Sequence, residues 1–202
     1  MKLFAHPESG HAFKIRFFLK AAGLEHDYEI VDIFQPHDNR SAEFREHSRY
    51  HEVPMLIDAG QAYVQSNAIL VHLAKKTGKW GAESPEQLRL SLEWLFWEAN
   101  KLGMCLPQLR ASEMFSATKL SDGAQAWLLA RYAHDVGLLD GAFSDGREFV
   151  TGSAPAIADF SLCGYLFFAD QAKVTVPDNV AAWLQRLSMI PGWAPPYELM
   201  AA

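Results

Sequence analysis

Residues 53–74, VPMLIDAGQAYVQSNAILVHLA, decide how the first part of the chain folds. Pro54 stands at the head of an apolar run, and a turn around Gly60 separates that run from a second one, the pattern of a β-hairpin. Three polar residues, 65–67, then stand directly before a series of apolar residues at helical spacing. The stretch therefore predicts two antiparallel strands followed at once by a helix over 66–76, with polar groups at the junction.

A strand–helix–strand unit precedes this hairpin. Residues 2–5 (KLFA) and 28–33 (YEIVDI) are predicted strands, and residues 11–22 carry a broad apolar face at helical spacing. A short helix over 41–47, with Ser41 as a possible cap, follows. Parallel strands joined by a helix, then a hairpin and another helix, predict a small mixed sheet.

The character of the sequence changes after residue 84, where only helices are predicted. The first, over 84–110, has Ser84 as its cap and Gln87 three residues later, and Pro107 is expected to kink or end it. Further helices are expected over 121–143, 157–172 and 177–193. We therefore predict an α/β sheet domain over 1–77, a linker over 78–83 and an all-helical domain over 84–202, sizes in keeping with small domains.

Composition limits the possible functions. Half of the 202 residues are hydrophobic and 21% are charged, which is typical of a globular protein. The net charge of -6, without a basic stripe, argues against nucleic acid as the main partner. No apolar run approaches the roughly 18 residues of a membrane span, and no signal peptide is visible. Cys105 and Cys163 form neither a CxxC pair nor a disulfide framework. We expect a cytoplasmic protein with no membrane partner.

Four segments, in this order and spacing, resemble the cytosolic glutathione transferase family. They are 9–24 (SGHAFKIRFFLKAAGL), 41–58 (SAEFREHSRYHEVPMLID), 65–74 (QSNAILVHLA) and 152–168 (GSAPAIADFSLCGYLFF). The resemblance covers nearly all of the chain, and it is greater to the serine-using classes (theta, zeta and delta) than to the others. It implies a thioredoxin-like N-terminal domain, a helical C-terminal bundle and glutathione as cosubstrate.

The resemblance also implies how glutathione is held. The Val53–Pro54 bond is expected to be cis, so that the backbone of Val53 pairs with the cysteinyl part of glutathione; a trans proline on an edge strand is the alternative. Gln65 and Ser66, with Asn67, stand where the family holds the γ-glutamyl carboxylate. Helix N-termini attract carboxylates through free N–H groups and a partial positive charge, although an ordinary helix cap also explains Ser66.

Ser9 matches the residue that serine-using classes place beside the glutathione sulfur. Its hydroxyl would donate a hydrogen bond that stabilises the thiolate and lowers a thiol pKa of about 8.5. His11 is the second candidate for this donor, and His51 matches a histidine near the cysteinyl and glycyl end of glutathione. The alternatives are a helix cap for Ser9 and solvated surface positions for the histidines.

The chain departs from the family pattern at three places. Asn39 stands where some classes have another histidine, and Ser48-Arg49 replaces an Asn-Pro pair. Ala156 replaces the Ser or Thr that usually completes a capping box with Asp159. The Asp159 carboxylate is still expected to accept hydrogen bonds at the helix start, as a folding feature.

The predicted function is that of a glutathione transferase, which activates the glutathione thiol for attack on small electrophiles and transfers alkyl or aryl groups other than methyl, as in detoxification. The alternative is a glutathione-binding protein of the same fold with little turnover. The helical domain is expected to cover a hydrophobic electrophile. Candidates for the pocket wall, each of which also fits an ordinary core position, are Trp94, Trp97, Met104, Cys105, Phe115 and Phe168.

A homodimer is the last expectation, and it rests mostly on the resemblance. The helix that begins at residue 84 carries apolar groups on more than one face, and a twofold interface is a common way to bury them. These residues are Leu88, Leu92, Leu95, Phe96 and Leu102. The alternative is a thick core, with six tryptophans, inside one chain.

Overall fold

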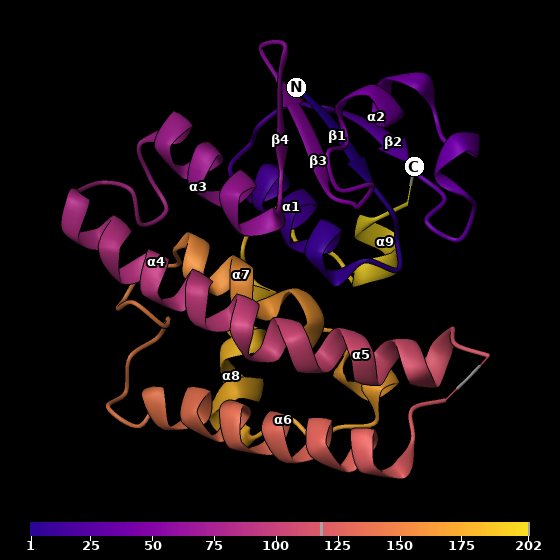
Figure 1. Cartoon of the computed structure of the whole chain (residues 1–202). Helices are drawn as coiled ribbons and strands as arrows, with labels where there is room; N and C mark the ends of the chain where they lie inside the picture. Colours follow the sequence, from indigo (N-terminus) through magenta and orange to yellow (C-terminus); the bar gives the residue numbers. More distant parts are fainter. Residues whose placement is uncertain (118, 202) are drawn as a thin grey trace.

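The N-terminal part of the chain is a four-stranded mixed sheet (Figure 1). The computed structural model describes residues 1–117 and 119–201. The strands are β1 (Lys2–Ala5), β2 (Asp27–Ile30), β3 (Met55–Asp58) and β4 (Gln61–Val64), in the spatial order β2-β1-β3-β4. β1 pairs in parallel with β2, and β3 runs antiparallel to β1 and β4. The predicted sheet and hairpin are confirmed, although β2 ends three residues earlier than expected.

Each face of the sheet is covered by a different set of helices. Successive side chains of a strand point to opposite faces, so Leu3 and Leu56 join the large core with α1 (Gly10–Ala21) and α3 (Ser66–Thr77). Phe4 and Met55 point the other way and pack with Phe44 of α2 (Ala42–His47). A short 3₁₀ helix, η1 (His37–Asn39), precedes α2. This arrangement is the expected thioredoxin-like fold.

The rest of the chain folds as the expected helical bundle. Its helices are α4 (Pro85–Asn100), α5 (Leu102–Met114), α6 (Asp122–Ala142), α7 (Ile157–Leu166), α8 (Asp178–Leu187) and α9 (Pro196–Leu199), with a 3₁₀ helix η2 (Ala169–Ala172). The helices predicted over 157–172 and 177–193 are therefore shorter in the structure. None of the helices in the described part of the chain has the length and apolar character needed to cross a membrane.

The structure corrects the predicted helix over 84–110. Ser84 caps it by accepting from the Gln87 amide, as expected, but the break comes at Lys101 (φ -120°, ψ -99°). Pro107 lies inside α5, which continues through it. A Cβ on Gly103 would meet Oε1 of Glu98 at 2.6 Å. The turn between α4 and α5 thus closes around the buried Glu98 carboxylate, a tertiary contact that the local sequence does not reveal.

Helix α1 joins the two parts of the chain, because it lies between the sheet and α7 (Figure 1). Phe17 and Phe18 are fully buried, and their rings pack against Phe160 of α7 at centroid distances of 4.8 and 5.0 Å. At the start of α7, the Asp159 carboxylate accepts hydrogen bonds from the Ala156 and Val150 amides and from the Trp183 indole. The expected hydrogen bonds to Asp159 at this helix start are confirmed.

Candidate functional site

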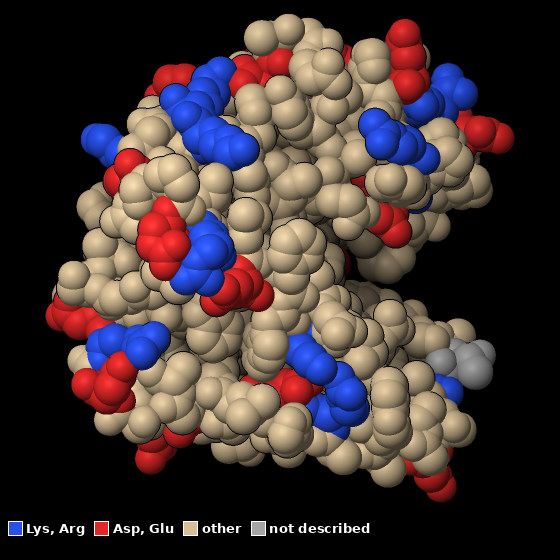
Figure 2. All heavy atoms as spheres, turned by 60° about the vertical axis from the view of Figure 1, so that its left-hand side comes forward, with Lys and Arg blue, Asp and Glu red and all other residues tan. Residues whose placement is uncertain are grey.

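A cavity of about 610 Å³ lies between the sheet and the helical bundle. Figure 2 shows the surface deeply notched between the upper, strand-containing half of the molecule and the lower, helical half. The N-terminal ends of α1 and α3 and the loop before β3 contribute to its lining. All of the site residues predicted from the sequence line this one cavity: Ser9, His11, His51, Val53, Pro54, Gln65, Ser66 and Asn67. Their binding and catalytic roles stay predictions.

Ser9 caps helix α1 from a buried position at the cavity. Its Oγ accepts a hydrogen bond from the Ala12 amide at 3.1 Å, and only 6% of the residue is exposed. A hydroxyl oxygen that accepts this bond keeps its own proton for another partner. The two interpretations of Ser9, as a helix cap and as a hydrogen-bond donor to a ligand, are therefore compatible.

His11 lies in the first turn of α1 and is half-buried, not solvated as the simpler interpretation assumed. Its ring meets the edge of Tyr165 at a centroid distance of 4.9 Å. Burial, with the nearby Lys14 ammonium, lowers the pKa of His11 to about 4. Its Nδ1 atom has no hydrogen-bond partner among the described residues. His11 is therefore a neutral imidazole near pH 7, and it is too weak a base to take a proton from a thiol.

Gln65 and Ser66 form the junction between β4 and α3. Gln65 has φ 70° and ψ 114°, a conformation that side-chain-bearing residues rarely adopt and that is concentrated at functional sites. Its Nε2 donates to Oε2 of Glu52 at 3.2 Å. Ser66 is the first residue of α3 and is half-buried. Because the first N–H groups of a helix have no intrahelical partner, this junction is suited to binding an anion.

Asn67 differs from its two neighbours, because protein groups already occupy its side chain. Its Oδ1 accepts from Lys14 Nζ at 2.8 Å and from Ser161 Oγ at 2.7 Å. Its Nδ2 donates to the Leu95 carbonyl and to Glu98 Oε2. Asn67 therefore supports the N-terminus of α3 from below and has little capacity left for a ligand.

Lys14 and Glu98 form a buried ion pair beneath the cavity. Lys14 Nζ lies 3.2 Å from Glu98 Oε2, and the exposed fractions of the two residues are 0% and 3%. Burial raises the pKa of Glu98, but Lys14, His11 and a hydrogen bond from Asn67 together lower it below its usual value. The Glu98 carboxylate is therefore ionised near pH 7, and it ties α4 to α1.

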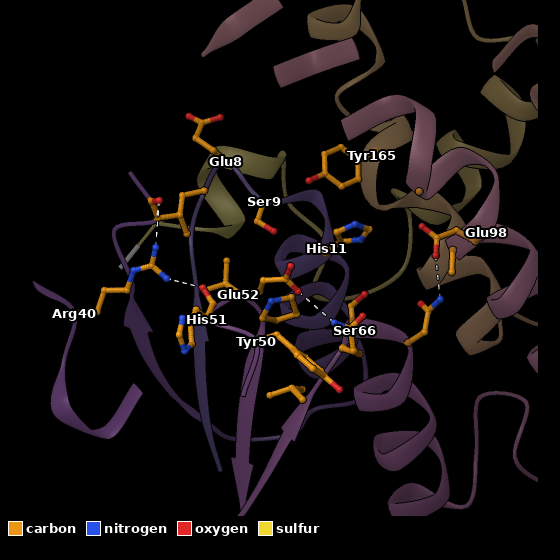
Figure 3. Close-up of a pocket in the computed structure, with 18 residues that line it drawn as sticks. Glu8, Ser9, His11, Arg40, Tyr50, His51, Glu52, Ser66, Glu98 and Tyr165 are labelled. Carbon is orange, nitrogen blue, oxygen red and sulfur yellow. Dashed lines mark hydrogen bonds between the residues drawn. The ribbon is translucent and has the colours of Figure 1, made fainter. Parts of the chain in front are cut away.

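The loop before β3 supplies another part of the lining. The Val53–Pro54 bond is cis, as predicted. The ring of His51 stacks on the ring of His37 at a centroid distance of 3.7 Å. The backbone carbonyl of His51 accepts from Arg40 Nη1 at 2.6 Å (Figure 3). Arg40 also donates to two carbonyls of the loop after β2. Arg40 thus connects the loop after β2 to the loop before β3, which contains residues 50–54.

The sequence did not indicate every residue that lines the cavity. The additional polar residues are Glu8, Arg40, Tyr50, Glu52, Glu98 and Tyr165. Glu8 and Glu52 adjoin Ser9 and Val53, so their neighbourhood was a usable signal. Tyr165 and Glu98 come from helices, and the sequence does not fix how a buried helix is rotated about its axis.

The structure corrects the expectation that aromatic and sulfur-containing residues of the helical domain form a wall of this cavity. None of the six candidates, four aromatic and two sulfur-containing, is among the described residues that line the cavity. Cys105 and Phe168 lie in the core, as their alternative interpretation held. Trp94 and Trp97 pack against each other at 5.4 Å, and Phe115 packs against Phe34 at 5.6 Å. Helical spacing alone marks residues as apolar but does not say which apolar face meets the cavity.

Comparison with known proteins bears on the geometry just described. Residues 1–75 match the model of the glutathione S-transferase N-terminal domain. The structure of human glutathione S-transferase T1-1 in its apo form superposes with a TM-score of 0.81 and 25% sequence identity, over 95% of this chain and 84% of that chain. Residues 1–75 thus belong to the glutathione S-transferase N-terminal domain family, and the whole chain is similar in fold to a glutathione S-transferase.

Two relatives differ in how much of this chain they match. Glutathione S-transferase D7 of Drosophila melanogaster is 26% identical over 203 residues, which cover 96% of this chain and 87% of that protein. The disulfide-bond oxidoreductase YfcG of Escherichia coli K12 is 33% identical over 112 residues. That match spans about half of each protein, 52% of this chain and 51% of YfcG.

Proposed function

We propose that the cavity binds glutathione and that the protein is a serine-type glutathione transferase. In this proposal the glutathione sulfur lies beside Ser9 as a thiolate and attacks a small electrophile. The observation that carries the proposal is the convergence of two helix N-termini on one cavity, with Ser9 at the start of α1 and Gln65-Ser66 at the start of α3.

Two parts of glutathione, the γ-glutamyl carboxylate and the cysteinyl backbone, have a suitable partner in this arrangement. The γ-glutamyl carboxylate is assigned to the free N–H groups of α3 and to the Ser66 hydroxyl, since helix N-termini favour anions. The cysteinyl backbone is assigned to Val53, where an extended peptide can pair as an added strand. These two contacts direct the cysteinyl side chain toward Ser9.

The energies involved are sufficient for activation of the thiol. A hydrogen bond from Ser9 to a charged sulfur contributes about 1.5–3 kcal/mol, and the α1 N-terminus adds about 0.3–1 kcal/mol. At about 1.36 kcal/mol per pKa unit, the sum lowers the thiol pKa by roughly one to three units. Starting from about 8.5, thiolate becomes the major form near neutral pH.

The test combines binding with turnover. Glutathione is titrated by calorimetry, with S-methylglutathione as a ligand that binds without forming a thiolate. Thiolate absorbance is followed as a function of pH, and turnover is measured with an aryl halide, an organic hydroperoxide and a mixed disulfide. We expect binding, a lowered thiol pKa and turnover of at least one electrophile class.

Each other outcome has a defined meaning. Binding with a lowered thiol pKa but no turnover of any electrophile favours the alternative, a glutathione-binding protein of the same fold. Turnover of the disulfide alone assigns the protein to disulfide chemistry, the activity by which YfcG is named. No binding of either ligand contradicts the proposal.

A further inference from the structure

Tyr165 brings a second hydroxyl group to the part of the cavity that holds Ser9. It lies in the last turn of α7 and lines the cavity, and its ring is half-buried against the edge of His11. Figure 3 shows its hydroxyl end directed toward Ser9, from the opposite side of the cavity to residues 50–52.

The position of the Tyr165 ring is fixed by an unusually close approach of α1 and α7. A Cβ on Gly10 would lie 2.8 Å from the Tyr165 ring and 2.9 Å from the Gly164 carbonyl. A Cβ on Gly164 would lie 2.7 Å from the Gly10 carbonyl. Only glycine permits these contacts. The two glycines therefore let the ring rest on the first turn of α1, next to the residue that caps it.

We propose that the Tyr165 hydroxyl donates a second hydrogen bond to the glutathione thiolate, beside the bond from Ser9. This inference rests on the proposed function. The sulfur carries the negative charge and its proton leaves to solvent, while the phenolic proton stays on the tyrosine oxygen. A phenol is a stronger acid than a serine hydroxyl, so it is the better donor to an anion.

The surroundings of Tyr165 favour the protonated phenol. Burial raises the pKa of Tyr165, and Arg110 together with hydrogen bonding to Gly10 and Ser9 offsets this only in part. The charged groups that act on the hydroxyl are Arg110 from α5 and Glu98 from α4, whereas His11 from α1 is neutral near pH 7. Tyr165 is therefore a donor and not a base across the neutral range.

The test measures the pKa of the bound glutathione thiol in Tyr165→Phe, Ser9→Ala and the double variant. Each single variant is expected to raise that pKa by roughly one unit, a tenfold loss of thiolate at a pH below the pKa, and the double variant by more than either. Affinity for S-methylglutathione is expected to stay within about twofold of wild type, because this ligand has no thiolate. The pH profile of turnover should shift by the same amount as the thiol pKa.

Tyr132→Phe is the matched control. Tyr132 lies on α6 outside the cavity, and its buried hydroxyl donates to the Thr175 carbonyl at 2.9 Å. This variant loses a buried tyrosine hydroxyl without touching the site, so its thiol pKa is expected to match wild type. A second variant, Tyr165→3-fluorotyrosine, keeps the ring and makes a stronger acid, and it is expected to lower the thiol pKa.

The results separate this inference from the proposed function. If Tyr165→Phe and the 3-fluorotyrosine variant both titrate like wild type while Ser9→Ala is shifted, the role of Tyr165 is overturned and the proposed function stands. If the wild-type protein binds no glutathione, the proposed function fails first. If Tyr165→Phe does not fold, the 3-fluorotyrosine variant decides by itself.

Discussion

A single serine, Ser9, caps the N-terminus of α1 and lines the cavity at the same time. We expect Ser9→Ala to raise the pKa of the bound glutathione thiol by about one unit or more, because a donor to a charged acceptor is lost. Glutathione affinity should change little, since the proposed contacts of glutathione with the α3 junction and Val53 are left in place. Spectroscopic titration of thiolate in the variant measures this directly.

Ser121→Ala separates the capping role of Ser9 from its proposed chemical role. Ser121 caps α6 by accepting from the Ala124 amide, and it is not among the described residues that line the cavity. Both variants should lose about 1 kcal/mol of stability through the missing cap, and only Ser9→Ala should move the thiol pKa. Superimposable thiolate titrations of Ser9→Ala and wild type would contradict the serine assignment.

His11 makes the stability of the protein depend on pH. Its pKa is about 4 in the folded protein and 6.5 in the unfolded chain, so the unfolded chain binds the proton more readily. The stabilising difference is present above pH 6.5 and is lost as the pH falls from 6.5 through 4, by about 3 kcal/mol. Chemical unfolding of wild type and His11→Gln between pH 6.5 and 4 tests this prediction. The free energy of unfolding of the variant should lack the decrease caused by protonation of His11. His134→Gln, at an exposed position on α6, is the control, and parallel curves for wild type and His11→Gln would refute the effect.

At the scale of elements, the sequence predicts what local patterns determine. The glycine turn at 59–61 and the polar residues at 65–67 were enough to define the hairpin and the start of α3. Pro107 was misleading, because Gly103 and the buried Glu98 decide where the helix breaks. The division into domains at 78–83 stays a prediction.

In the candidate site, too, some residues could be predicted from the sequence and others could not. Ser9 and Gln65-Ser66 at the helix starts and His51, Val53 and Pro54 before β3 could be predicted, because the sequence resembles glutathione transferases at these positions. Tyr165 and Glu98 could not, because they depend on how α7 and α4 are rotated and on how closely α1 approaches α7.

The contact between α1 and α7 yields a prediction with an internal control. Gly164→Ala should destabilise the fold, because the new Cβ would meet the Gly10 carbonyl, a backbone atom that cannot move aside. Gly137→Ala on α6 has open space around it and should stabilise by about 0.5–1 kcal/mol through lower helix entropy cost. Free energies of unfolding in denaturant should therefore change in opposite directions. Equal, favourable shifts in both variants would show that the two helices can separate without loss.

For the whole molecule, we expect a homodimer. Leu95 and Leu102, which the sequence offered to an interface, lie in the core of their own chain at 3% and 1% exposure. Phe96 on α4 remains 74% exposed, so part of the apolar excess is still uncovered. Sedimentation at micromolar concentration should show a species near twice the monomer mass of 22.6 kDa. Phe96→Asp should shift the equilibrium toward the monomer. Met189→Asp, which also changes an exposed apolar residue, should not. A wild-type species of 22.6 kDa would exclude the dimer.

The buried Lys14–Glu98 pair also limits how the molecule can move. It joins α1 of the sheet part to α4 of the bundle, so swinging the two halves apart would strip both charges of their partners. Losing one partner of a buried pair costs roughly 3–5 kcal/mol, which opposes a hinge motion of the kind that opens many two-part enzymes. We therefore expect a ligand to enter through rearrangement of the two loops on either side of α2, which carry Arg40 and His51, on the nanosecond to microsecond timescale of loops. The two halves of the molecule should meanwhile behave as one rigid body.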